Sequence, residues 1–272
     1  MQELANLESK LGTHAAAMRV LALEVCADRK RLPVVFPGLP RRFGKDLLRE
    51  GRITFGTALL DLGAFRTCDL AAALLLLQVA VTEAEGFDLY EHGDIEERAM
   101  LLRALHVLAP GALTVRMLGE VQRTNMVLHL EAACCDGDLL RRTVGQPGFG
   151  VVEQNRMLLK IAFLDLPLAR VFHAEQLANQ ELSRMLQDLA TEREAAGRSV
   201  WRDTDRLISR APVAGTIARI LGGLEHGDDG RRLAAVEGLI LLNRKDLAPF
   251  AIERLAREPR DVVRKLLVQA AG

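Results

Sequence analysis

Leucine and alanine recur at helical spacing along most of the chain. Over residues 2–27, Leu4, Leu7, Leu11 and Met18 fall on one face of a helix. Valine occurs throughout but never alternates with polar residues over the length of a strand, so no substantial sheet is predicted. We expect an all-α fold, an array of antiparallel helix pairs of the α-solenoid or HEAT-like kind.

Proline and glycine interrupt the helical pattern in three places. The three prolines between residues 33 and 40 predict a loop over residues 29–52, which packs either on the body of the protein or on a partner. Residues 52–62 fit a short strand or a helix broken at Gly56, and we favour a loop with a short helix. Residues 86–93 are expected to form a turn.

Capping residues predict where several helices begin. Thr67 or Asp69 is expected to cap a helix reaching about residue 83. Its apolar run is much shorter than the roughly 20 residues of a membrane span, so it is predicted to be a buried helix. Asp94 and Glu97 resemble a capping box. Further helices are expected over residues 95–108, 113–122, 124–134, 151–164, 180–196 and 213–224, with a loop over 135–150.

The C-terminal part shows internal repetition. The segment beginning at Arg232 (RLAAV) is similar to the one beginning at Arg264 (RKLLV), with a further helix predicted over residues 247–257. This spacing is typical of HEAT-like helical hairpins, although a generic helical hairpin is the alternative. We expect two regions: a helical domain over residues 1–200, and HEAT-like repeats over residues 201–272 packed continuously on it.

Composition narrows the classes of function. Lys and Arg together number 36, as do Asp and Glu, and this zero net charge argues against a nucleic-acid-binding protein. The N-terminal helix lacks the apolar core of a signal peptide, so a cytoplasmic protein is expected. The four cysteines show no CxxC spacing and are expected to be buried free thiols.

Recognisable catalytic motifs are absent from the sequence. It contains no GxxxxGK[ST], GxSxG or HExxH pattern. None of the six histidines lies three or four residues from another, so no metal site is predicted. We therefore expect neither cofactor nor metal, and favour a protein that is not an enzyme.

Polar residues on apolar helices are the candidates for binding. Arg123, Thr124 and Asn125 stand at the predicted start of a helix, where capping alone explains their type. Asn155 is predicted to be buried and to need partners, either Arg123 or backbone groups. A structural network and a pocket between helices both remain open. The candidate binding residues are Arg123, Thr124, Asn125, Asn155, Lys160 and Asn179.

A second candidate lies in the proline-rich segment. Arg42 and Lys45 flank Gly44, whose backbone lets an anion approach closely. The alternative is that the two cations are simply solvated. Peripheral contact with a membrane surface through RRFGK is a third hypothesis.

The central stretch resembles a known family. RTNMVLHLEAACCD, EQNRMLLKIAFLDLPLARVF and NQELSRMLQDLATEREAAGR, preceded by FPGLPRRFGK, are similar to successive segments of EboA-domain proteins over about residues 36–200. The chain departs from the family pattern at Gln180, where proline is usual, at Leu189, where tyrosine is usual, and over residues 136–150.

The resemblance implies a function without a known reaction. EboA proteins are encoded in bacterial clusters linked to secondary metabolites, in cyanobacteria to export of a pigment precursor. The expected function is a non-catalytic adaptor or scaffold that contacts other proteins of a biosynthetic or export assembly. The alternative is a small-molecule-binding protein or enzyme with a pocket around Arg123, Asn155 and Lys160. The oligomeric state stays open.

Overall fold

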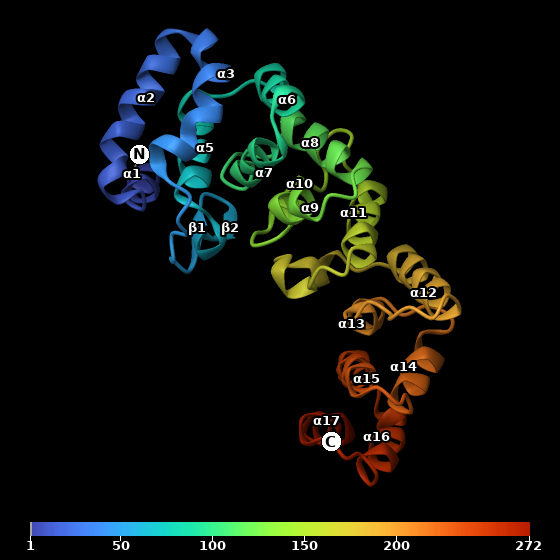
Figure 1. The fold of residues 1–272 in the computed structure, drawn as a ribbon. Coiled ribbons are helices and arrows are strands. Elements are labelled where there is room, and N and C mark those ends of the chain that lie inside the picture. Colours follow the sequence, from blue (N-terminus) through green and yellow to red (C-terminus); the bar gives the residue numbers. More distant parts are fainter. Residues whose placement is uncertain (1) are drawn as a thin grey trace. The chain divides into compact units, whose positions relative to one another are not determined.

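The computed structural model describes residues 2–272, whose regular secondary structure is helical apart from one two-stranded hairpin (Figure 1). The all-α class is confirmed, while the solenoid arrangement stays a prediction. Contacts divide the chain into two compact units. Unit 1 contains the described residues up to Gln154 together with Ala169–His173, and unit 2 contains Asn155–Leu168 and Ala174–Gly272. The domain boundary expected near residue 200 also stays a prediction.

Unit 1 is built around a fully buried helix, α5 (Thr67–Gln78). Every residue from Leu70 to Leu76 is 0% exposed, as the apolar run predicts. Helix α5 packs against α2, α4 and α7, and α7 in turn packs against α6 and α9. The helices of unit 1 are α1 (Gln2–Ser9), α2 (Ala15–Ala27), α3 (Leu32–Val35), α4 (Leu39–Phe43), α5, α6 (Glu83–His92), α7 (Ile95–Ala104), α8 (Ala112–Arg123), α9 (Val127–Cys134) and α10 (Leu139–Thr143).

The N-terminal segments differ from their prediction in two ways. The single helix expected over residues 2–27 is wrong, because the chain turns between α1 and α2 at Gly12, which has a positive φ of 56°. The loop expected in the proline-rich segment is instead a series of short helical turns. Each proline occupies a first-turn position, where its missing N–H breaks no helical bond. Phe36 and Phe43 are buried, so this segment packs on unit 1.

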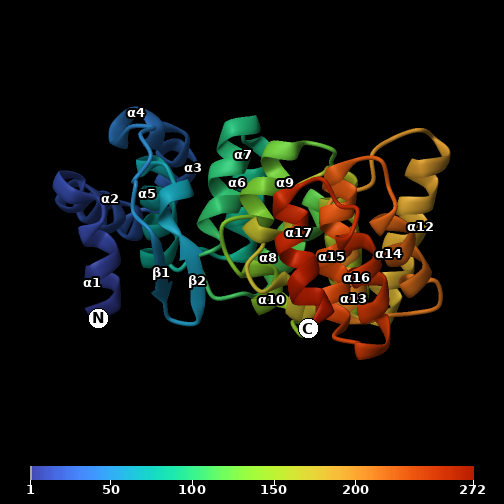
Figure 2. The same ribbon diagram turned by 90° about the horizontal axis from the view of Figure 1, so that it is seen from below.

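Residues 52–61 form a β-hairpin, so the predicted loop and short helix are wrong there. Strands β1 (Arg52–Phe55) and β2 (Ala58–Asp61) pair antiparallel just before α5 (Figure 2). Gly56, with φ 56°, makes the reversal possible. The strands are only four residues long, too short for alternation to identify them.

Three further predictions for unit 1 differ from the structure. Helix α5 ends at Gln78 rather than near residue 83. The turn expected over residues 86–93 is helix α6, which begins after a capping box at Thr82. Helix α10 occupies part of the loop expected over residues 135–150. The Asp94–Glu97 capping box is confirmed, and starts α7.

Unit 2 consists of helices that pack on their neighbours in sequence. Helix α11 (Val151–Phe163) crosses the boundary between the units. It is followed by α12 (Gln180–Ala195), α13 (Thr204–Arg210), α14 (Thr216–Leu224), α15 (Asp229–Leu242), α16 (Ala248–Leu255) and α17 (Asp261–Ala271). Helix α15 packs against α13, α14 and α17, and α16 packs against α17. Helix α13 was not predicted, whereas the Asn179 cap of α12 is confirmed.

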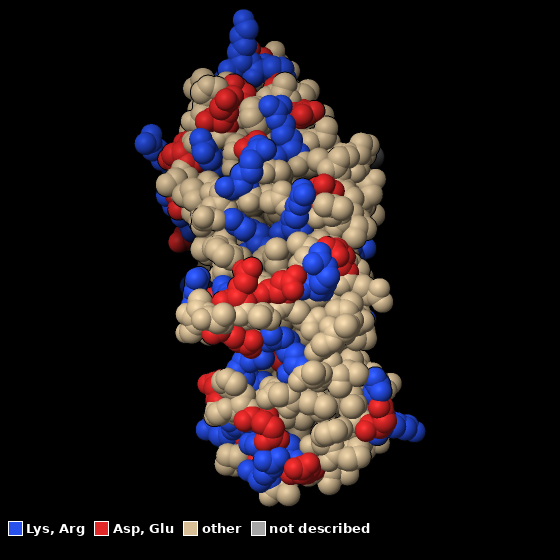
Figure 3. Space-filling view, turned by 90° about the vertical axis from the view of Figure 1, so that its right-hand side faces the viewer, with Lys and Arg blue, Asp and Glu red and all other residues tan. Residues whose placement is uncertain are grey.

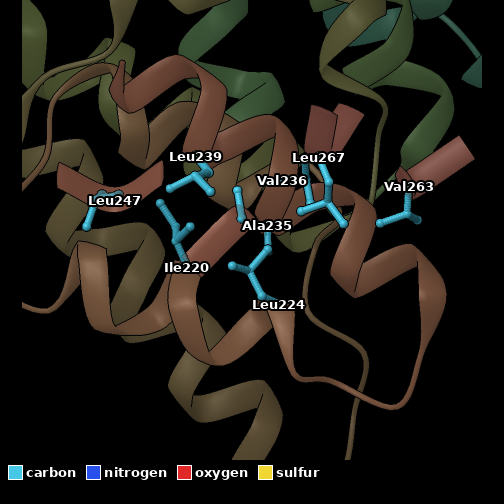
Figure 4. Close-up of a cluster of buried hydrophobic side chains, with 9 residues drawn as sticks. Ile220, Leu224, Ala235, Val236, Leu239, Leu247, Val263 and Leu267 are labelled. Atoms are coloured by element: carbon cyan, nitrogen blue, oxygen red, sulfur yellow. The ribbon is translucent and has the colours of Figure 1, made fainter. Parts of the chain in front are cut away.

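Side chains from α14 to α17 share one apolar core. Ile220, Leu224, Val236 and Leu267 are at most 2% exposed and point toward one another from three helices (Figure 4). Burying one such side chain contributes on the order of 2 kcal/mol. The HEAT-like character of these helices stays a prediction.

Charged side chains of both signs are distributed over the surface, between uncharged areas. Figure 3 shows basic and acidic residues side by side over much of the face drawn, and in unit 2 Arg219 pairs with Glu194 at 2.9 Å. Cys68, Cys134 and Cys135 are buried free thiols, but Cys26 is exposed, so the expected burial is wrong for it. None of the helices within residues 2–272 is both long and apolar enough to cross a membrane.

Candidate functional site

A pocket of about 360 Å³ opens in unit 1. It lies where the C-terminal end of α5, the start of α6 and the start of α8 meet. Most of its lining is apolar: Leu76, Leu77, Ala80, Val81, Leu108 and Leu113. Glu83, Ala109, Gly111, Ala112 and Thr114 complete the lining of this site, which we call the α8 pocket. Its volume and apolar character are typical of small-molecule sites.

The two walls of the α8 pocket at the end of α5 and the start of α6 are determined by residues close together in the sequence. After α5 ends at Gln78, Ala80 adopts the left-handed conformation, and the N–H of Val81 donates to the carbonyl of Leu76. Thr82 then caps α6 immediately, its Oγ1 accepting from the N–H of Glu85. This abrupt change of direction leaves the end of α5 facing the start of α8.

The start of α8 supplies hydrogen-bond donors to the pocket. Its N-cap is Gly111, which has no side chain to accept from the first amides. Within residues 2–272, the N–H groups of Ala112, Leu113 and Thr114 have no hydrogen-bond acceptor. Thr114, which is only 2% exposed, also lines the pocket. Polar groups in this apolar site therefore converge at one helix end.

An ion pair stands at the edge of the pocket. Arg116 Nη1 lies 3.5 Å from Glu83 Oε1, and the Arg116 guanidinium stacks over the Phe87 ring at 3.2 Å from its centroid. Both members of the pair are partly solvated, so their attraction is worth less than about 1 kcal/mol. The negative charge of Glu83 is nevertheless compensated, because the Arg116 guanidinium lies beside it.

A buried arginine fixes the loop that shapes the pocket floor. Arg142 donates to the carbonyl oxygens of His106 at 2.6 Å and Leu108 at 3.2 Å. Its Nε donates to Asp138, which is 1% exposed and also accepts from the N–H of Leu59. The acidic loop that follows α9 thus holds the loop before α8 in place.

A second arginine closes the same acidic loop. Arg170 binds both carboxylate oxygens of Asp136, with Nε–Oδ1 at 3.0 Å and Nη2–Oδ2 at 2.7 Å, and also pairs with Glu131. The hydrogen bonds to Asp136 raise the pKa of Arg170 despite its partial burial. The two carboxylates of this loop, Asp136 and Asp138, are therefore each paired with an arginine.

His106 packs beneath this loop as a neutral residue. Burial, followed by the nearby Arg103, lowers the pKa of His106 to about 4. Its Nε2 lies 3.1 Å from the Ala132 carbonyl oxygen, while Nδ1 has no partner within the described residues. A Cβ at position 137 would lie 2.3 Å from Nδ1, so only glycine fits there. His106 is therefore a packed core residue.

The side chains around the α8 pocket are better suited to binding a molecule than to catalysing a reaction. Glu83 is the titratable group of the pocket lining, and it already has a cation beside it. Burial raises the pKa of Cys135 to about 12, so this thiol is not a nucleophile at neutral pH. Within residues 2–272, no group of three or more His, Cys, Asp or Glu side chains is placed to hold a metal ion.

Comparison with protein families matches residues 64–209 to the family described as "Metabolite traffic protein EboA". This match spans more than half of the 272-residue chain. The protein belongs to the EboA family. No curated protein and no solved structure matches the chain. The family's description indicates a role in handling metabolites, and the α8 pocket lies entirely within the matching segment.

The binding residues predicted from polar positions on apolar helices are divided between the two units. In unit 1, Arg123 is an exposed side chain at the end of α8 and pairs with Glu120. Thr124 Oγ1 accepts from the N–H of Met126 at 3.1 Å, which satisfies a backbone donor just before α9. Neither side chain lines the α8 pocket.

In unit 2, the structure brings two of the predicted binding residues together. The side-chain amides of Asn155 and Asn179 exchange two hydrogen bonds, at 3.0 and 2.7 Å. Asn155 is 2% exposed, as predicted, but Asn179 is a partner that sequence analysis did not name. The same Asn179 caps α12 by accepting from the N–H of Leu182. Lys160 Nζ lies over the Phe163 ring, 5.8 Å from its centroid.

Arg42 and Lys45 lie outside the segment that matches the EboA family. Both are exposed, and the Arg42 guanidinium lies 5.8 Å from the centroid of the Phe43 ring. Gly44 has a positive φ of 88°. Their role as an anion or surface contact stays a prediction.

The α8 pocket was not predicted from the sequence, although one signal for it was present. Pro110 and Gly111 lie between the helices predicted over residues 95–108 and 113–122, and Gly111 is the N-cap of α8. A helix that begins after glycine, without Ser, Thr, Asp or Asn at its cap, leaves its first amides free. An uncapped helix start followed by Thr114 was thus visible in the sequence, but the facing apolar wall of α5 was not.

Proposed function

We propose that this EboA-family protein handles metabolites as a non-catalytic binding protein that holds an apolar small molecule in the α8 pocket. The observation that supports this proposal is the open, mainly apolar pocket of about 360 Å³ within the family-matching segment. A volume of this size accommodates about a dozen water-sized groups. The protein would carry or present its ligand without changing it chemically.

Titration with a neutral fluorescent probe, 1-aminoanthracene, tests this function. Ala109 is exposed and lines the pocket, so Ala109→Trp introduces a bulky ring at the opening without disturbing the core. Ala195→Trp, at an exposed position of α12, is the matched control. We expect Ala109→Trp to weaken probe binding at least about tenfold, the size expected from losing several apolar contacts.

Equal binding by wild type and Ala109→Trp would contradict the proposal. The non-catalytic part has its own measurement: a ligand that co-purifies with the protein should be recovered chemically unchanged after prolonged incubation, as judged by mass spectrometry. Formation of a new product during incubation would show that the protein is an enzyme.

An adaptor role in a biosynthetic or export assembly is a second candidate. Four large apolar side chains are exposed on the last two helices of unit 2: Phe250 and Ile252 on α16, and Val262 and Val268 on α17. Exposed apolar side chains on neighbouring helices are a feature of protein-binding surfaces. These helices lie outside residues 64–209, so a contact there would be separate from the pocket.

The double substitution Ile252→Lys/Val262→Lys tests the adaptor role. Both side chains are more than half exposed, so folding should be unaffected. Pull-downs with the products of neighbouring genes should recover a partner with the wild type and lose it with the double variant. Identical recovery with both proteins would argue against this surface as the adaptor contact.

A further inference from the structure

An amphipathic helical segment lies at the edge of unit 1. Residues 29–43 form successive helical turns that include α3 and α4, and the backbone stays right-handed at each junction (Figure 2). The inward face consists of four apolar side chains that are at most 2% exposed: Leu32, Phe36, Leu39 and Phe43. The outward face consists of four exposed side chains at the same helical spacing: Lys30, Val34, Pro37 and Arg41. The protein therefore holds one face of the segment and leaves the other open.

The open face is strongly basic, although the chain as a whole has zero net charge. Residues 29–45 contain six Lys or Arg and no Asp or Glu. Two of the six are paired, Arg29 with Glu85 and Arg31 with Glu24. Within residues 2–272, the other four have no Asp or Glu at ion-pairing distance: Lys30, Arg41, Arg42 and Lys45. Their charges are therefore available to a polyanion.

Exposed apolar side chains lie among these cations. Val34 is 77% exposed, more than any other large apolar side chain in the described part of the chain. It lies one helical turn from Lys30 and two turns from Arg41. Leu47, just beyond the segment, is 56% exposed. A partner that covers this face must therefore accept apolar and cationic groups side by side.

Two carboxylates lie to one side of the segment. Asp88 and Glu97 line a recess of about 330 Å³ whose other wall includes two prolines of the segment. The Asp88 carboxylate lies 3.2 Å from His92 Nδ1, and Glu97 accepts from the N–H of Asp94 at the start of α7. Val34 does not line this recess, so these carboxylates are separate from the outward face.

We propose that residues 29–45 form a surface that docks unit 1 on a membrane leaflet containing anionic lipids. The unpaired cations contact lipid phosphates, and Val34 enters the boundary between head groups and acyl chains. Clusters of four or more Lys or Arg beside apolar side chains are typical of such contacts. A nucleic acid is a poorer match, because single-strand sites add aromatic side chains for stacking, and the exposed side chain here is an aliphatic valine.

This docking does not depend on ligand binding in the α8 pocket. None of residues 29–45 lines that pocket, and all of them lie outside the segment that matches the EboA family. Failure of one proposal therefore leaves the other standing.

Flotation with lipid vesicles tests the docking. The full chain is mixed with vesicles of phosphatidylcholine and phosphatidylglycerol in equal parts, or of phosphatidylcholine alone, and the fraction of protein that floats through a sucrose gradient is measured. We expect the protein to float with the mixed vesicles only. At about 0.5 M NaCl the Debye length is below about 5 Å, so most of the protein should be released.

Two double variants with the same change in net charge locate the contact. Arg41→Glu/Lys45→Glu reverses two unpaired cations of the proposed surface, whereas Arg198→Glu/Lys265→Glu reverses two exposed cations of unit 2. Each cation near an anionic leaflet contributes roughly fivefold to affinity, so the first variant should bind at least about thirtyfold more weakly and the second less than about twofold. Val34→Gln keeps every charge and should weaken binding about threefold. All five positions are exposed, so folding should be unaffected.

Four results would overturn the assignment. The first is a wild-type protein that does not float with the mixed vesicles, and the second is equal flotation of the two double variants. The third is unchanged flotation of Val34→Gln, which would show that no apolar side chain enters the membrane. The fourth is tighter binding of the wild type to duplex DNA or polyglutamate than to the mixed vesicles, which would identify the surface as a site for a different polyanion.

Discussion

Arg232 and Glu258 form an ion pair buried in unit 2. Arg232 donates to both carboxylate oxygens, with Nε–Oε2 at 2.8 Å and Nη2–Oε1 at 3.0 Å. Their side chains are 6% and 0% exposed. Glu258 also accepts from Arg254 at 2.8 Å and from the N–H of Arg260 at 3.0 Å. Removing one partner therefore leaves a buried charge with incomplete compensation.

We expect Arg232→Met to destabilise unit 2 by about 3 kcal/mol. Breaking a buried pair typically costs about 3–5 kcal/mol, and Arg254 retains part of the compensation, which places this case at the low end. The Arg232 guanidinium also donates to the carbonyl oxygens of His226 and Gly227, and these contacts are lost too. Methionine preserves the apolar stem, so packing contributes little to the change.

The free energy of unfolding is measured in urea by fluorescence of Trp201, the single tryptophan of the chain. Trp201 is 2% exposed within unit 2, and its Nε1 donates to the Leu166 carbonyl oxygen, so its emission reports on that unit. Arg244→Met is the matched control, because Arg244 pairs with Asp246 at the surface. We expect the control to leave the urea midpoint close to that of the wild type, because solvent screens exposed ion pairs.

The pH dependence provides a second signature of the Arg232–Glu258 pair. Burial opposes ionisation of Glu258, but hydrogen bonds from Arg232 and Arg254 outweigh it and lower its pKa from 4.5 to about 2. A carboxylate with a lowered pKa stabilises the fold above its unfolded pKa, and this contribution is lost as the pH falls through the folded pKa. The difference between wild type and Arg232→Met should therefore shrink from about pH 4.5 to 2. A cost for Arg232→Met no greater than that of the control would refute the reasoning.

Three further predictions concern glycine packing, pH and a helix cap. Gly137→Ala would place a Cβ 2.3 Å from His106 Nδ1 and should destabilise unit 1 by about 1–3 kcal/mol in thermal unfolding followed by circular dichroism. The pKa of His106 is lowered to about 4, so its contribution to stability is complete above about pH 6.5 and declines toward pH 4. The free energy of unfolding should fall by at most about 1.4 kcal/mol per pH unit in this range. In His106→Phe, the free energy of unfolding should depend less on pH between pH 7 and 5. Asn179→Ala removes the α12 cap and a partner of Asn155, and should cost about 2 kcal/mol by Trp201 fluorescence, whereas an effect below 0.5 kcal/mol would contradict the assigned cap.

Local chemistry explains why some elements were predictable. The Asp94–Glu97 capping box and the Asn179 cap depend on atoms a few residues apart, so their pattern in the sequence is nearly sufficient. The apolar run of α5 similarly predicts burial because its whole circumference is hydrophobic. These features needed no knowledge of neighbouring elements.

Other elements were mispredicted because a distant contact decided them. Gly86 and Gly93 suggested a turn, yet they lie in and directly after α6. A Cβ at Gly86 would lie 2.6 Å from the Leu113 methyl groups, so this glycine permits close packing of α6 on α8. The prolines before α5 likewise look like helix breakers until each is seen in a first-turn position.

The sequence by itself determined the helical class, the Asp94 and Asn179 caps, the buried α5 helix and the resemblance to the EboA family, because each depends on residue type and short spacing. Only the tertiary structure revealed the pairing of Asn155 with Asn179 and the α8 pocket. The pocket combines the end of α5 with a helix start more than thirty residues later. Such a juxtaposition results from packing between helices, which no local pattern encodes.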